Sequence, residues 1–165
     1  MPKALAAAIA SGALLISVSG TAVAAPPPTP SDLDVQFKVG EACPDFALKI
    51  TGTGSKARII KFKNGSMITA GRGYLLTFTN LNTGESIIIK AAGSVQKEST
   101  DPVTGITTGQ GTGDNGFVYF STDSPPGPAT IMYTGRITYS YDRDLNYTVS
   151  STTGTQRDIC AELSS

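Results

Sequence analysis

The chain has 165 residues, with 13 Lys and Arg against 13 Asp and Glu, no His and no Trp. Without histidine it cannot form a Ser-His-Asp triad, a Cys-His pair or an HExxH zinc site. The balanced charge also argues against a nucleic-acid-binding protein, which needs a basic face to neutralise phosphates. The composition therefore excludes histidine chemistry and leaves a broad range of functions open.

Residues 1–24 have the pattern of a secretory signal peptide. Lys3 precedes an apolar stretch of roughly a dozen residues, and an Ala-Val-Ala site follows at residues 22–24. The alternative, a retained membrane anchor, needs about 20 unbroken apolar residues, and here Ser and Gly interrupt the stretch. We therefore expect cleavage after Ala24, a secreted protein that is extracellular or associated with the cell wall, and no membrane insertion after cleavage.

The rest of the chain divides into a spacer and one domain. Residues 25–31 read Ala-Pro-Pro-Pro-Thr-Pro-Ser, which favours an extended chain over a helix or a central strand. We expect residues 25–41 to form a Pro-rich N-terminal spacer and residues 42–165 to form a secreted β domain.

The two cysteines, Cys43 and Cys160, lie at opposite ends of this domain. In an exported chain they have one intramolecular pairing, which predicts a disulfide; two buried free thiols are the alternative. A disulfide would place the first strand beside the last segment.

From residue 45 onward no stretch has helical periodicity, and short runs of Ile, Val, Thr, Tyr and Phe alternate with turn residues. The expected early strands are residues 46–50, 58–63, 66–70, 73–80 and 85–91, with an Asn-Gly hairpin turn at residues 64–65. Residues 99–116 are rich in Gly and Thr, which indicates a long mobile loop or an irregular hairpin.

The expected later strands are residues 117–122, 129–142, 145–151 and 155–161, the last of which carries Cys160. Residues 129–142 alternate with a period of two, and a flat strand of that length would span roughly 45 Å, too long for a domain of this size. We therefore expect a bend or bulge at Gly135; a hairpin turn at Thr134-Gly135 is the competing interpretation. The whole pattern predicts an all-β, single-domain antiparallel barrel or strongly curved β-sandwich of about 8–10 strands, closed by one disulfide.

Four tyrosines are the candidate ligand-facing residues. Tyr133, Tyr139, Tyr141 and Tyr147 share one parity, so they could line one surface and stack on a flat ligand, or line a cavity inside a barrel. The alternative is that they pack in the core, since Tyr is a good strand former.

Two other groups are weaker candidates. Residues 142–146 read Asp-Arg-Asp-Leu-Asn, like the start of a calcium loop, but Tyr147 and Thr153 stand where that loop needs Gly and Glu. A polar hairpin turn is therefore favoured there. A basic group, Lys56, Arg58, Lys61 and Lys63, could meet an acidic surface polymer, although a solvated strand face is the favoured interpretation. Two cysteines alone make no zinc site, and we expect no metal and no cofactor.

The chain resembles small exported actinobacterial β-rich proteins of unknown function. The resemblance lies in the Ala-rich signal, Ala-Cys-Pro-Asp-Phe at residues 42–46, Thr-Asn-Leu-Asn-Thr-Gly at residues 79–84 and Tyr-Thr-Gly-Arg at residues 133–136. It implies secretion and a β-rich fold, and it brings no catalytic or binding residues.

No GxSxG motif or paired acid and base is present, so we expect a non-catalytic protein. The first hypothesis is a binding or interaction module with a cell-surface or extracellular partner and no role on nucleic acid. The alternative is a carrier of a small apolar ligand in an aromatic-lined barrel cavity.

Overall fold

A computed structural model of the chain describes residues 33–91 and 93–164. The expected signal peptide and the Pro-rich run before Leu33 lie outside the described residues. The elements are β1 (Leu33–Phe37), β2 (Leu48–Thr53), β3 (Lys56–Lys61), β4 (Ser66–Arg72), β5 (Leu75–Asn80), β6 (Ser86–Lys90), β7 (Ser94–Thr100), β8 (Thr107–Tyr119), β9 (Ala129–Tyr141), β10 (Tyr147–Thr152), β11 (Thr155–Asp158) and α1 (Ile159–Glu162).

The strands form two antiparallel sheets. Sheet A has the order β1-β2-β5-β6, and sheet B has the order β10-β9-β8-β7-β4-β3, with β11 paired to the first half of β9. The predicted all-β curved sandwich is confirmed. The barrel alternative is wrong, because the sheets do not close on each other: β3 and β6 are end strands with one partner each among the described residues.

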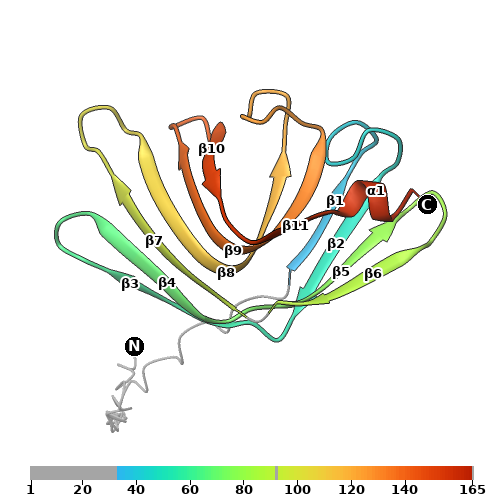
Figure 1. The fold of residues 1–165 in the computed structure, drawn as a ribbon, viewed down its shortest axis with the longest axis horizontal. Helices are drawn as coiled ribbons and strands as arrows, with labels where there is room; N and C mark the ends of the chain where they lie inside the picture. Colours follow the sequence, from blue (N-terminus) through green and yellow to red (C-terminus); the bar gives the residue numbers. More distant parts are fainter. Residues whose placement is uncertain (1–32, 92, 165) are drawn as a thin grey trace, which may run out of the picture.

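Sheet B is folded into a trough. Figure 1 shows that β8 and β9 bend sharply near their middles, at a crease, so that each strand lies in both arms of the trough. The first arm contains the first half of β8 and the last half of β9; the second arm contains the last half of β8 and the first half of β9, and sheet A lies beside it. A line of glycines with positive φ crosses the sheet at this crease: Gly71, Gly93, Gly113, Gly135 and Gly154. A Cβ on any of them would overlap a backbone carbonyl oxygen of a neighbouring segment. The crease therefore needs residues without a side chain, and the predicted bend at Gly135 is confirmed within one continuous strand.

Residues 99–116 form a hairpin and not a long loop, because the end of β7 pairs antiparallel with the first half of β8; of the two interpretations, the hairpin is confirmed and the loop is wrong. Its glycines lie beneath large side chains of the neighbouring strand. A Cβ on Gly109 would overlap the ring of Tyr139, and one on Gly111 would lie 3.0 Å from Ile137 Cγ2. The apolar cover of β8 thus comes from β9, which is why β8 itself contains so few apolar residues.

Two boundaries at the ends of the domain also need correction. β1 (Leu33–Phe37) pairs with β2, so the domain includes residues assigned to the spacer. The last strand ends at Asp158, whose carboxylate accepts a hydrogen bond from the Ala161 N–H and caps α1. Cys160 therefore lies in a helical turn. Its predicted disulfide with Cys43 is confirmed, with Cα atoms 5.4 Å apart.

The apolar side chains form two cores. The sandwich core lies between sheet A, the second arm of sheet B and α1, and its buried residues include Leu48, Phe78, Met132 and Ile159. The trough core fills the concave side of sheet B and is described with the candidate site below.

Candidate functional site

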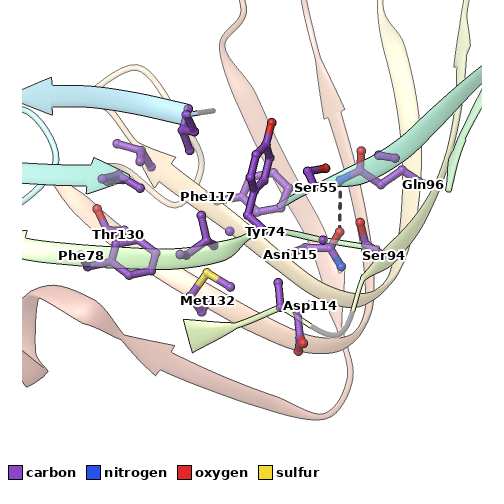
Figure 2. A pocket seen from close by; sticks show the side chains of 18 of the residues that line it. Ser55, Tyr74, Phe78, Ser94, Gln96, Asp114, Asn115, Phe117, Thr130 and Met132 are labelled. Carbon is purple, nitrogen blue, oxygen red and sulfur yellow. Dashed lines mark hydrogen bonds between the residues drawn. The ribbon is translucent and has the colours of Figure 1, made fainter. Parts of the chain in front are cut away.

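A pocket of about 450 Å³ lies beside the sandwich core, between sheet A and the crease of sheet B. One wall is the inner face of sheet A, with Leu33, Val35, Phe37, Ile50, Leu76 and Phe78. Val118 and Met132 of sheet B face this wall. Figure 2 shows that Phe78, Thr130 and Met132 lie at one end of the pocket, while polar side chains gather at the other. The pocket is therefore amphipathic along its length.

The pocket exists because two strands end their pairing here. β7 pairs with β8 only as far as Gly113, so residues 114–119 of β8 pair with β9 alone. β1 is the end strand of sheet A. The two strand edges border one space, and no third strand among residues 33–91 and 93–164 fills it. Gly116 keeps the pocket wall open, because a side chain there would crowd Met132: its Cβ would lie only 2.8 Å from Met132 Sδ.

The polar end is built around Asn115, which is 3% exposed. Its Oδ1 accepts a hydrogen bond from Gln96 Nε2 at 3.1 Å, and its Nδ2 donates to the Gly113 carbonyl at 3.3 Å. Ser55 and Ser94 lie near it (Figure 2). This end offers amide and hydroxyl groups to the polar part of a ligand.

One cation and one anion line the pocket. The Arg72 guanidinium donates to the Gly54 carbonyl from Nε at 3.3 Å and from Nη2 at 3.2 Å. The Asp114 carboxylate accepts a hydrogen bond from Thr134 Oγ1 at 2.7 Å. The lining therefore contains one side chain of each sign, and each is already hydrogen-bonded to the protein.

The predicted tyrosines do come together, but in the trough and not in this pocket. Tyr133 and Tyr139 are buried, at 5% and 3% exposed, while Tyr141 and Tyr147 are half-buried with ring centroids 4.9 Å apart. Phe117 lies among them and also lines the pocket. Tyr141 also lines a separate, smaller hollow. The role of the four tyrosines as ligand contacts stays a prediction.

The phenol groups of the trough core are held by specific hydrogen bonds. The hydroxyl oxygens of Tyr119 and Tyr133 lie 2.6 Å apart, and Tyr139 Oη donates to Glu98 at 2.8 Å. Burial, followed by these hydrogen bonds, raises the pKa values of Tyr119 and Tyr139. Burial also raises the pKa of Tyr147. Near neutral pH these three phenols therefore stay protonated and cannot serve as general bases.

The calcium-like segment forms a tight turn. The Asp142 carboxylate accepts hydrogen bonds from the backbone N–H groups of Asp144 and Asn146, and from Asn146 Nδ2. These hydrogen bonds, first of all that from the Asn146 side chain, lower the pKa of Asp142. Both carboxylate oxygens thus serve the turn. In residues 33–91 and 93–164 no group of three or more acidic or cysteine side chains is arranged to hold a metal ion.

Sequence reasoning missed the pocket because it assigned β1 to the spacer. The signal was present: Leu33, Val35 and Phe37 alternate with the polar Asp34 and Gln36. No pattern in a single strand could reveal Gln96, Asn115 and Arg72 as neighbours, because the crease brings three strands together there.

In comparisons with known proteins, no family model, curated protein or solved structure matches this chain. No helix in the described part of the chain is long and apolar enough to be a membrane span.

Proposed function

We propose that this protein is an exported, non-catalytic binding protein that holds a small, neutral, amphipathic molecule in the pocket between its sheets. The observation behind this proposal is the pocket itself. Its volume of about 450 Å³ lies in the range of small-molecule sites, and its walls are mainly apolar. The ligand's apolar body would lie against β1, β2 and β5. Its hydroxyl, carbonyl or amide group would lie toward Asn115.

Two features support a neutral ligand and no reaction. The lining has one cation, Arg72, and one anion, Asp114, and both are hydrogen-bonded to the protein, so an ion would gain little net attraction. Asp114 is the only carboxylate among the described lining residues, so a pair of carboxylates for acid and base catalysis is not provided there. Export is supported by the Cys43–Cys160 disulfide, which is a bond typical of oxidising compartments.

The test uses two fluorescent probes with one aromatic skeleton. N-phenyl-1-naphthylamine is neutral, whereas 1-anilinonaphthalene-8-sulfonate carries a sulfonate. We expect the folded protein to enhance the emission of the neutral probe at micromolar concentration and to bind the anionic probe at least about tenfold more weakly. Equal binding of both probes would remove the argument for a neutral ligand.

Val35→Trp is the variant that fills the pocket. Val35 is 37% exposed on an end strand, so the larger ring can enter the pocket without displacing the sandwich core. Ile88→Trp is the matched control, because Ile88 is 67% exposed on β6 and does not line the pocket. We expect the first variant to lose probe binding and the second to keep it, both with unchanged thermal unfolding. Retained binding in Val35→Trp would overturn the proposal.

Native mass spectrometry of protein purified from its own culture medium tests for the natural ligand. A dissociable adduct that is present in the wild type and absent from Val35→Trp would identify the ligand by its mass. The same spectrum would report the mass of the mature chain and so the predicted cleavage after Ala24.

A further inference from the structure

β3 is an edge strand with an unusual surface. It is the last strand of sheet B, and β4 is its one described partner. Phe62 N–H donates to the Ser66 carbonyl at the hairpin turn, and backbone hydrogen bonds in an antiparallel pair involve every second residue. The N–H and C=O groups of Ile59 and Lys61 therefore point away from β4. This edge can accept another strand.

Large apolar side chains are exposed on both faces of this edge. Ile59 is 61% exposed, Ile60 is 54% exposed, and Phe62, which follows the strand, is 46% exposed. Ile60 lies opposite Ile68 of β4, so the apolar surface extends onto the sheet. A shallow hollow lined by Phe62, Ile68 and Lys97 adjoins it. An edge that needed only protection from aggregation would carry charges or Pro without three such side chains.

The same segment is strongly basic. Residues 56–63 contain Lys56, Arg58, Lys61 and Lys63 and no acidic residue, in a chain whose overall formal charge is zero. The two ion pairs among described residues are Lys49–Asp34 and Arg157–Glu162, so none of these four cations is paired with a described carboxylate. The cations and the large apolar residues are therefore interspersed along one extended segment.

We propose that the β3 edge is a docking site for an extended, acidic segment of a partner protein, which adds to sheet B as a further antiparallel strand. The outward backbone groups would form main-chain hydrogen bonds, the cations would select acidic side chains, and Ile59, Ile60 and Phe62 would contact apolar ones. A second copy of β3 fits poorly, because four cations would then face four cations. An anionic polymer would satisfy the charges but leave the backbone groups and the apolar side chains unused.

The probe is a capped octapeptide with the sequence Glu-Val-Glu-Val-Val-Glu-Thr-Glu, which places Glu opposite each cation and Val opposite Ile59, Ile60 and Phe62 in an antiparallel pairing. We expect saturable binding by the folded protein and slower hydrogen exchange of the Ile59 and Lys61 amides. A peptide with Lys in place of every Glu should not bind. Binding without protection of those two amides would overturn strand addition.

Two sets of variants distinguish the contribution of the cations to binding from that of the backbone hydrogen bonds. Lys61→Glu with Lys63→Glu should weaken peptide binding at least about tenfold. Its control, Lys38→Glu just after β1 with Lys90→Glu at the end of β6, makes the same change in net charge away from β3 and should leave binding unchanged. Ile59→Pro removes one outward N–H at a position that an edge strand tolerates, and it should abolish binding, whereas Ile59→Val should not.

An anionic polysaccharide, polygalacturonate, tests the other source of negative charge. If it binds as tightly as the peptide and Ile59→Pro has no effect on either, the site recognises charge alone and the proposal is wrong. Thermal unfolding of each variant, compared with the wild type, shows that lost binding does not reflect lost folding.

Discussion

Gly113 of β8 and Gly135 of β9 are direct register partners at the crease of sheet B, and both have positive φ, 90° and 131°. A Cβ on Gly113 would overlap the carbonyl oxygen of Gly93, and one on Gly135 would overlap that of Thr153. The crease is therefore a place where neighbouring backbones approach too closely for any side chain. Because the pocket and both cores adjoin this crease, the fold of the whole domain depends on it.

Replacing Gly113 with Ala should destabilise the protein by about 3 kcal/mol, because it adds backbone strain and a clash with a backbone atom that cannot move freely. Gly65→Ala is the matched control. Its φ is 81°, but nothing lies within 4 Å of the added Cβ, so we expect a loss of about 1 kcal/mol. Urea unfolding of both variants measures the difference. Equal losses would mean that φ alone, and not the close approach, requires glycine at the crease.

The bend was predictable from sequence, whereas the crease as a whole was not. The period-two alternation of residues 129–142 extends over more residues than a flat strand in this domain can have, so Gly135 can be identified as the bend from its own strand alone. Gly93 and Gly154 lie between strands, where glycine is ordinary, and Gly71 is the second-last residue of β4; only strand pairing aligns them with Gly135. Local patterns identify strands and turns; they do not identify which turns become neighbours.

The candidate site shows the same limit. The shared parity of Tyr133, Tyr139 and Tyr141 correctly places them on one face of β9, since the first two lie in the trough core and the third packs against it. Parity cannot say whether that face meets a ligand or its own sheet. Here the sheet folds over the face, so its neighbours include the apolar residues Phe117 and Val149.

Gly109→Ala should destabilise the protein by about 2 kcal/mol, because the added methyl would displace the Tyr139 ring, whose hydroxyl donates to Glu98. Gly116→Ala, on the same strand, is the control. Its Cβ would meet the Met132 thioether, a flexible side chain that adapts, so we expect a change below about 1 kcal/mol. Denaturant unfolding checks both values. A larger loss in Gly116→Ala than in Gly109→Ala would contradict the proposed role of the ring.

The trough core should stabilise the protein less at alkaline pH. Burial raises the pKa values of Tyr119 and Tyr139 above their unfolded value of about 10, so they stabilise the protein below that pH. The stabilisation decreases as pH rises above about 10, because the unfolded chain then loses protons that the folded chain retains. We expect the free energy of unfolding to fall steeply between about pH 10 and 12.

Tyrosinate absorbance provides the measurement, since phenols with raised pKa values should ionise only when the protein unfolds. Tyr139→Phe should show a shallower alkaline loss than the wild type, because one of the shifted phenols is gone. If all six tyrosines ionise together near pH 10 while the protein stays folded, the burial argument is wrong.

The Cys43–Cys160 disulfide should contribute strongly to stability, because it joins residues 117 positions apart and restricts nearly the whole unfolded domain. By loop-closure entropy, Cys43→Ala with Cys160→Ala should lower the free energy of unfolding by about 3–5 kcal/mol. The alanines avoid two buried thiols, since Cys43 is 0% and Cys160 5% exposed. Hydrogen exchange should then increase first in α1 and in the segment before β2, whose contacts with each other the bond maintains. If the double variant unfolds at the same urea concentration as the oxidised wild type, the fold is held by its sheets alone and the bond has no stabilising role.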